Sequence, residues 1–203
     1  MNCLLDVDGC IINNSEMFIR LVQDWLIKNG MTGEIKNANG YSVKEIFDVD
    51  VDWETIYTDI DFADFYVVSP MDYVAEVTTY LKLKGHNVII LTSRNPSLKI
   101  PVTAKMRAMF NLSMAVKEID LNWLTKAYLH YHDIPYDKVV YEHDKAVYAL
   151  SLEGDTIALD DATFNLTAYK NAGVRCVAAA YPHNRDIDVE RIVDWREFVN
   201  IIE

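Results

Sequence analysis

Short apolar, β-branched runs alternate along this chain with segments long enough to form helices. Each run is bounded by polar or turn residues, which is typical of buried strands. The predicted strands are Cys3 to Val7, Asn87 to Leu91, Lys138 to Tyr141, Thr156 to Leu159 and Val174 to Ala178. Apolar residues at helical spacing lie between them, for instance from Pro70 to Lys84 and from Leu121 to His132. This alternation predicts an α/β fold, a doubly wound parallel sheet that is covered on both faces.

Residues 13–71 interrupt this alternation. They contain a helical pattern that includes Phe18, Val22 and Trp25, and then an Asn-rich turn that ends at Gly40. We recognise no strand with a crossover helix in this stretch. We therefore expect a small helical cap at residues 13–71, inserted into a core domain that consists of residues 1–12 and 72–203.

The charge of the chain restricts its partners. Its 203 residues include 31 acidic and 19 basic ones, which gives a formal net charge of −12. This charge disfavours binding to a nucleic acid polymer or to an anionic membrane. Cys3, Cys10 and Cys176 lie in or beside apolar runs, as reduced and buried thiols do. Because we see neither a secretory leader pattern nor an apolar run of membrane-spanning length, we expect a cytoplasmic protein.

Polar residues stand at the ends of the first four predicted strands. They are Asp6 and Asp8, then Thr92, Ser93 and Arg94, then His143, Asp144 and Lys145, and finally Asp160 and Asp161. In a parallel sheet the carboxyl ends of the strands share one edge, and ligands bind beyond it. Several carboxylates suit Mg²⁺, which prefers hard oxygen ligands, and hydroxyl and ammonium groups suit a phosphate. The pattern predicts a cation site with a phosphate site beside it.

The same residues suit phosphoryl transfer. A carboxylate such as Asp6 can act as a nucleophile, and a second acid two residues later can exchange protons with the leaving oxygen and with water. The like charges of Asp6 and Asp8 are tolerable if a divalent ion and Lys145 offset them. The alternative is that these acids merely end a strand and begin a turn. Lys138 is an alternative to Lys145 as the phosphate-binding lysine.

Four segments, LLDVDG, VIILTSR, EHDKAV and TIALDD, resemble in order the four motifs of the haloacid dehalogenase-like phosphohydrolases. The resemblance implies that Asp6 is the nucleophile and that Asp8 is the general acid and base. It implies a phosphate-binding role for Thr92 and Lys145, with Ser93 beside them. The implied ligands of a Mg²⁺ ion are Asp6, Asp8 through its carbonyl, and the side chain of Asp160, with Asp161 assisting.

Within that superfamily, the segments NGYSVKEIF, IPYDKVVY and the closely spaced HDKAV and DTIALDD resemble the 5′(3′)-deoxyribonucleotidases. This likeness implies a nucleoside monophosphate as the substrate, with Asn13, Tyr41 and Ser42 as cap residues that contact it. Two alternatives stay open: a phosphatase of a sugar phosphate or another small phosphoester, and a catalytically idle protein that binds a nucleotide or phosphate. The Met-rich stretch from Met106 to Val116 suits either the core or the seam of a homodimer.

Overall fold

A six-stranded parallel sheet forms the centre of the computed structural model, which describes residues 1–51, 55–56 and 59–203. The strand order is β5-β2-β1-β6-β7-β8. The strands are β1 (Asn2–Leu5), β2 (Asn87–Thr92), β5 (Lys138–Tyr141), β6 (Thr156–Asp160), β7 (Arg175–Ala179) and β8 (Glu190–Ile192). Each neighbouring pair is parallel. The chain leaves β1 toward β2 on one side and later continues toward β8 on the other, so the predicted doubly wound sheet is confirmed.

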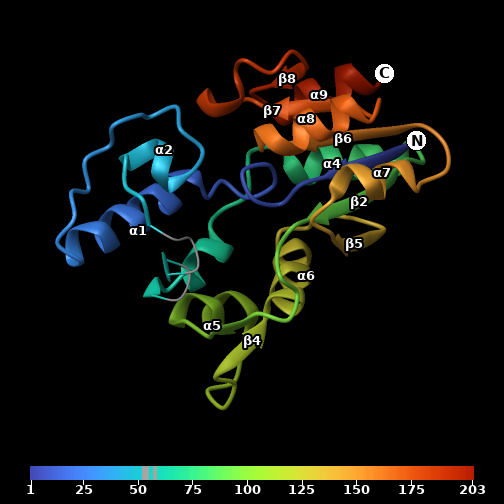
Figure 1. Ribbon diagram of the computed structural model, residues 1–203. Helices are drawn as coiled ribbons and strands as arrows, with labels where there is room; N and C mark the ends of the chain where they lie inside the picture. The colour runs from blue at the N-terminus through green and yellow to red at the C-terminus, as the bar shows by residue number, and fades with distance from the viewer. Residues whose placement is uncertain (52–54, 57–58) are drawn as a thin grey trace.

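Helices cover both faces of this sheet (Figure 1). One face packs against α4 (Val74–Leu83), α6 (Leu121–Tyr131) and α9 (Trp195–Ile202), and the other against α7 (Lys145–Leu150) and α8 (Thr163–Asn171). Successive residues of β1 serve the two layers: Leu5 is buried with the first set of helices and Leu4 with the second. This alternation explains why strands with two covered faces read as continuous apolar runs.

The region after β1 is helical, as the sequence predicts. It contains α1 (Ser15–Lys28), α2 (Val43–Phe47) and the 3₁₀ helix η1 (Ala63–Val67). Figure 1 shows these elements beyond the carboxyl end of β1. The predicted cap, residues 13–71, includes positions 52–54 and 57–58, which lie outside the described residues. Its division from the core at these boundaries remains a prediction.

A second segment packs with this helical region. It comprises β3 (Lys99–Pro101), α5 (Ala104–Phe110) and β4 (Glu118–Asp120), and β3 and β4 form an antiparallel pair. Ile100 and Met106 of this segment belong to the same buried cluster as Leu26 and Tyr66. Residues before and after β2 therefore share one apolar core outside the main sheet.

Met106 is fully buried whereas Met114 is 71% exposed, so the Met-rich stretch divides between core and surface. Cys3, Cys10 and Cys176 are free and buried, as predicted. Among the described residues, we find no helix with the length and hydropathy that a membrane crossing requires.

Candidate active site

Lys145 connects two carboxylates from different strands. Its Nζ lies 2.7 Å from Asp6 Oδ1, just beyond β1, and donates to Asp160 Oδ2 at the end of β6 over 2.8 Å. Lys145 is the first residue of α7, which Asp144 caps by accepting from the Val147 amide. Burial raises the pKa of Asp6 to about 7, against the opposing effect of the Lys145 ammonium. Burial alone would lower the pKa of Lys145, but the two acids raise it, so the lysine stays charged.

The alternative lysine lies elsewhere. Lys138 begins β5, is exposed, and places its Nζ over the ring of Tyr148. Lys145 lies past the carboxyl end of the same strand, which is the end that faces Asp6. The structure thus brings Lys145, and not Lys138, to the first acid.

Asp160 is a fully hydrogen-bonded carboxylate, 1% exposed. Besides the bond from Lys145, it accepts from the Ala162 amide to Oδ1 and from Asn165 Nδ2 to both oxygens, each over 3.0 Å. Its oxygens are therefore directed at protein donors. Asp160 holds Lys145 in place between the ends of β1 and β6.

Asp161 lies close to Asp6 and Cys10. One donor atom each from Asp6, Cys10 and Asp161 lie within 4.8 Å of one another, and all three residues are buried. Burial, with the nearby charges of Asp160 and Asp6, raises the pKa of Asp161 well above its usual range. The Asp161 carbonyl accepts from Asn184 Nδ2 over 2.8 Å, which fixes the backbone at this position.

Asp8 has a different environment. Arg94 donates from Nε to Oδ2 over 2.8 Å and from Nη2 to Oδ1 over 2.6 Å, and Asn14 Nδ2 donates to Oδ1 over 2.6 Å. Burial opposes ionisation here, but the charge and hydrogen bonds of Arg94 lower the pKa of Asp8. The Gly9 amide donates to Asn14 Oδ1, so the turn after Asp8 is joined to the start of α1.

The two hydroxyl side chains at the carboxyl end of β2 make different contacts. Thr92 is 1% exposed, and its Oγ1 accepts from the Arg94 amide over 3.3 Å. Ser93 directs its Oγ toward the carbonyl of Glu142, at 3.3 Å. Thr92 thus lies within the buried group around Arg94, whereas the hydroxyl of Ser93 turns toward the end of β5.

The three cap residues that we expect to contact the substrate have different surroundings. The Tyr41 ring lies 5.0 Å from the His183 ring and 6.1 Å from the Phe164 ring, centroid to centroid. His183 Nε2 lies 3.0 Å from the Asp161 carbonyl oxygen, so Tyr41 stands at the edge of the acidic group. Ser42 is occupied as the N-cap of α2, where it accepts from the Glu45 amide. Asn13 is exposed, and its amide donates to the Ser69 carbonyl.

Several residues at this site have no individual role in the prediction from the sequence. They are Cys10, Asn14, Arg94, Asn165 and His183. The position of Arg94, two residues after Thr92 at a predicted strand end, is a sequence signal that it belongs to the site. Asn14 stands directly before a helical pattern, where asparagine is a common N-cap, and this pattern does not indicate a contact with Asp8. In the structure its side chain binds Asp8 and makes no capping bond to α1.

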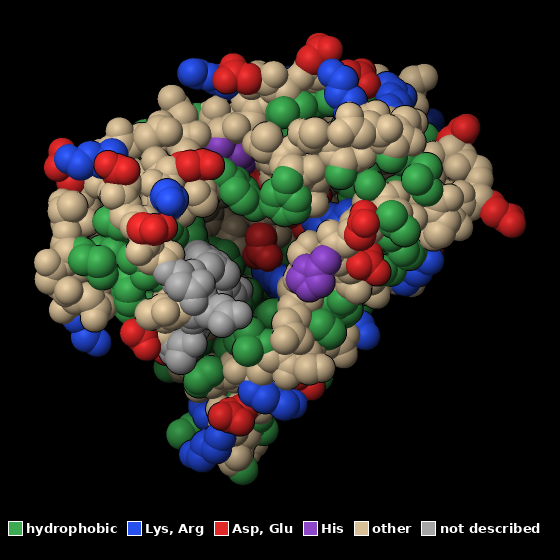
Figure 2. All heavy atoms as spheres, in the orientation of Figure 1, with side chains coloured by type: hydrophobic (Ala, Val, Ile, Leu, Met, Phe, Trp, Pro, Cys, Tyr) green, Lys and Arg blue, Asp and Glu red, His purple; other side chains and the backbone are tan. Residues whose placement is uncertain are grey.

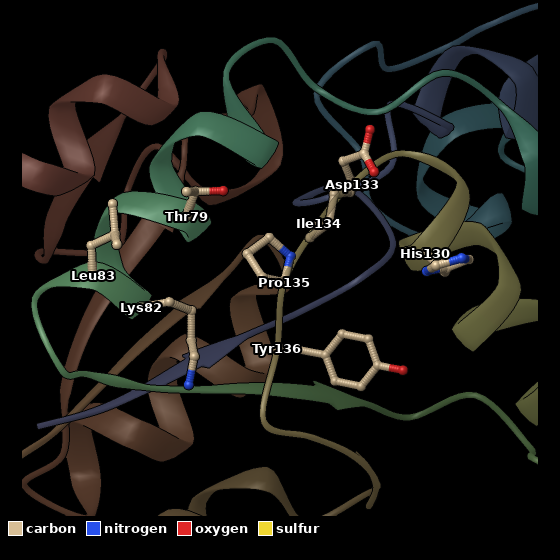
Figure 3. A pocket seen from close by; sticks show the side chains of 8 residues that line it. All are labelled: Thr79, Lys82, Leu83, His130, Asp133, Ile134, Pro135 and Tyr136. Carbon is tan, nitrogen blue, oxygen red and sulfur yellow. The ribbon is translucent and has the colours of Figure 1, made fainter.

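Figure 2 shows a hollow near the centre of the visible face, with acidic and basic side chains at its bottom. A separate groove of about 550 Å³ lies between the end of α4 and the segment that leads from α6 into β5 (Figure 3). Ile134, Pro135 and Tyr136 line it and lie shortly before the amino end of β5. This groove is therefore at the opposite edge of the sheet from Asp6.

No protein-family model matches the chain, and no curated protein matches it in sequence. Solved structures do match. A haloacid dehalogenase-like family hydrolase from Streptococcus pneumoniae has a TM-score of 0.63 at 11% identity, and the match covers 100% of this chain and 98% of that one. A predicted phosphoglycolate phosphatase from Haemophilus somnus 129PT has a TM-score of 0.60 at 14% identity, and the match covers 100% of this chain and 97% of that one. CbbY from Rhodobacter sphaeroides in complex with phosphate has a TM-score of 0.57 at 14% identity, and the match covers 97% of this chain and 95% of that one.

These likenesses define the class of the fold: a Rossmann-like α/β core with a helical region after the first strand. More narrowly, the chain has the haloacid dehalogenase-like fold. The similarity extends over nearly the full length of the chains compared. It gives no support to the narrower resemblance to the 5′(3′)-deoxyribonucleotidases.

Proposed function

We propose that this chain is a Mg²⁺-dependent phosphomonoesterase that acts on a sugar phosphate or another small phosphoester through an aspartyl-phosphate. The observation that carries the proposal is the placement of Lys145 against Asp6, next to Asp161 and at the carboxyl edge of the sheet. This arrangement provides a carboxylate nucleophile with a cation beside it to stabilise the phosphoryl oxygens. Ligands in doubly wound folds bind at this edge.

The donor atoms fit a divalent cation. Asp6 and Asp161 are buried acids with raised pKa values, and their carboxylates lie close together. A bound cation would offset this charge, and hard oxygen donors favour Mg²⁺. We assign Asp6, Asp161 and the carbonyl of Asp8 as ligands. Because the Asp160 oxygens accept from Lys145, Asn165 and a backbone amide, we assign Asp160 to holding Lys145. When bound, the ion supplies positive charge next to the phosphate.

The residues of the chain then perform two transfers. An Asp6 oxygen forms a bond to phosphorus while the ester P–O bond breaks. The ester oxygen keeps the electron pair and takes a proton that the Asp8 carboxylate has received from the phosphate monoanion of the substrate. In the second transfer, a water oxygen bonds to phosphorus and gives a proton to Asp8, which passes it to the released phosphate. The P–O bond to Asp6 breaks, and its electron pair returns to the Asp6 carboxylate. Lys145 and the Thr92 hydroxyl hold the phosphoryl oxygens.

The ligands or described activities of two structural neighbours support a small substrate. CbbY has been solved with xylulose 1,5-bisphosphate as well as with phosphate, and the Haemophilus protein is described as a phosphoglycolate phosphatase. The formal charge of −12 also suits a small ligand better than a polyanion.

A panel of phosphomonoesters with Mg²⁺ tests the proposal. It should include sugar phosphates, phosphoglycolate, nucleoside monophosphates and p-nitrophenyl phosphate. We expect phosphate release from at least one small phosphoester, abolition by Asp6→Asn, and no change in Asp186→Asn, whose carboxylate is exposed and lies beside Arg185. No release from any member of the panel would overturn the assignment. Tight binding without turnover would support an idle phosphate-binding protein.

A nucleoside monophosphate is the second candidate substrate. Tyr41 and Phe164 leave 42% and 57% of their surface exposed beside His183, and exposed rings can stack on a base. If a nucleoside monophosphate is the substrate, nucleotides should have higher kcat/KM values than sugar phosphates in the same panel. Equal or lower values would defeat it.

A further inference from the structure

One guanidinium binds both oxygens of the Asp8 carboxylate. The bonds run from Arg94 Nε to Oδ2 and from Nη2 to Oδ1, at 2.8 and 2.6 Å. A bidentate pair of this kind fixes the orientation of a carboxylate as well as its charge. The Asp8 side chain is 34% exposed, whereas that of Arg94 is 4% exposed. The pair therefore presents the carboxylate to the site and keeps the cation behind it.

Arg94 is itself held from three sides. Its Nη1 donates to Thr125 Oγ1 on α6 over 3.1 Å, and its guanidinium carbon lies 4.9 Å from the centre of the Tyr66 ring on η1. Its backbone amide donates to the Thr92 hydroxyl. A solvated surface arginine has no such set of contacts. Arg94 thus joins Asp8 to a core helix and to the helical region after β1.

We infer that Arg94 is a positioning residue: its fixed guanidinium orients Asp8 for proton exchange with the ester oxygen and then with water. The inference rests on the proposed function, in which Asp8 exchanges these protons. Lysine cannot replace this role, since a single ammonium does not match both oxygens at once.

Substrates with different leaving groups distinguish the positioning of Asp8 by Arg94 from a merely structural role of Arg94. An alkyl ester oxygen departs as a poor leaving group and needs the proton that Asp8 passes to it. A p-nitrophenolate ion departs without a proton. Loss of correct Asp8 orientation should therefore slow the first transfer from an alkyl phosphate and leave that from p-nitrophenyl phosphate nearly unchanged. The second transfer uses the same Asp8 for every substrate, so it should slow equally for both.

The test compares Arg94→Met and Arg94→Lys with the wild type on two substrates, p-nitrophenyl phosphate and the alkyl phosphate that the wild type hydrolyses best. We expect kcat/KM for the alkyl phosphate to fall by at least about 10²-fold, the usual contribution of general acid catalysis, in both variants. We expect kcat/KM for p-nitrophenyl phosphate to fall less than about threefold on the same basis. A burst of one p-nitrophenolate per enzyme should show that the phosphoenzyme accumulates.

Two further variants keep the test decisive. Thr125→Val removes one partner of Arg94 with little change of volume. It should lower kcat/KM for the alkyl phosphate more than for p-nitrophenyl phosphate, to a smaller degree than the Arg94 variants. This variant tests the inference even if Arg94→Met does not fold. Arg175→Met breaks an exposed bidentate pair with Glu190 and should leave both substrates unaffected. An equal loss for both substrates, without a burst, in the Arg94 and Thr125 variants would overturn the inference. Failure of the wild type on the whole panel would instead overturn the proposed function.

Discussion

The carboxylate of Asp161 occupies the space that a side chain at Gly9 would need. A Cβ atom on Gly9 would lie 2.5 Å from Asp161 Oδ2 and 2.6 Å from its Cγ, and Gly9 has a φ of +74°. Glycine at this turn therefore serves two needs, the left-handed backbone and the close approach of an acid from the end of β6. Gly30 has the same φ but no atom within 4 Å of the corresponding Cβ position.

Gly9→Ala and Gly30→Ala should separate these two needs. Both variants force a side chain into the left-handed region, at a cost of roughly 1–2 kcal/mol in the free energy of unfolding. Gly9→Ala must also displace Asp161, so we expect its Mg²⁺ affinity to fall by about 10- to 100-fold, as when support of a metal ligand is lost. Calorimetric titration with Mg²⁺ and urea unfolding measure the two effects. Equal Mg²⁺ affinities in the two variants would remove Asp161 from the proposed ligands.

Lys145→Met should lose both activity and stability, whereas Lys138→Met should lose neither. Removal of the Lys145 ammonium leaves two buried acids without their shared partner. Breaking a buried ion pair in this way costs about 3–5 kcal/mol in the free energy of unfolding. Lys138 is exposed, and surface substitutions change stability by about 0.5 kcal/mol or less. Urea unfolding and phosphate release measure both variants, and comparable losses in the two would argue against the assignment of Lys145.

The fold was predictable because its signals are local. The strands from Asn87, Lys138 and Thr156 begin where the apolar runs predict them, since a strand with two covered faces is apolar throughout. β8 was not predicted, because its three residues include Glu190 and Arg191 and it pairs only with β7. The β3–β4 pair was missed as well, since strands of three residues have no detectable period.

The candidate site was predictable only as a set of strand ends. The sequence placed Asp6, Lys145 and Asp160 at one edge, and the structure puts them in contact. Their individual partners depend on contacts between distant segments. Arg94 binds Asp8 across 86 positions of the chain, and no period or spacing encodes such a pair. The different surroundings of Asp160 and Asp161, adjacent in sequence, also follow from the tertiary structure alone.

The stability gained from Mg²⁺ should increase with pH. The pKa of Asp6 is raised from 3.8 to about 7 in the folded protein, and that of Asp161 is raised too, so the folded state binds protons that the unfolded state releases. Without metal, the stability present at low pH is therefore lost as the pH rises from about 4 to about 7. A cation that binds the ionised acids in the folded state restores it.

Thermal unfolding at pH 5 and pH 8, with EDTA or with Mg²⁺, measures this linkage. We expect a larger rise in Tm from Mg²⁺ at pH 8 than at pH 5. In Asp6→Asn, which cannot ionise at this position, the loss of stability between the two pH values should be smaller. An equal Mg²⁺ effect at both pH values would contradict the proposed role of the buried acids.

Tyr41→Ala should weaken substrate binding without weakening the binding of inorganic phosphate. Tyr41 packs against His183, which contacts the Asp161 backbone. We therefore expect its exposed ring to face the part of a substrate beyond the phosphate. Loss of one aromatic contact of roughly 0.5–1.5 kcal/mol corresponds to a rise in KM of about two- to tenfold. Tyr131→Ala is the matched control, because Tyr131 is 50% exposed and packs against Phe110 near the end of α6. Steady-state kinetics give KM, and product inhibition gives the phosphate affinity. A parallel loss of phosphate affinity in Tyr41→Ala would show that the ring supports the phosphate site itself, and an unchanged KM would remove Tyr41 from substrate recognition.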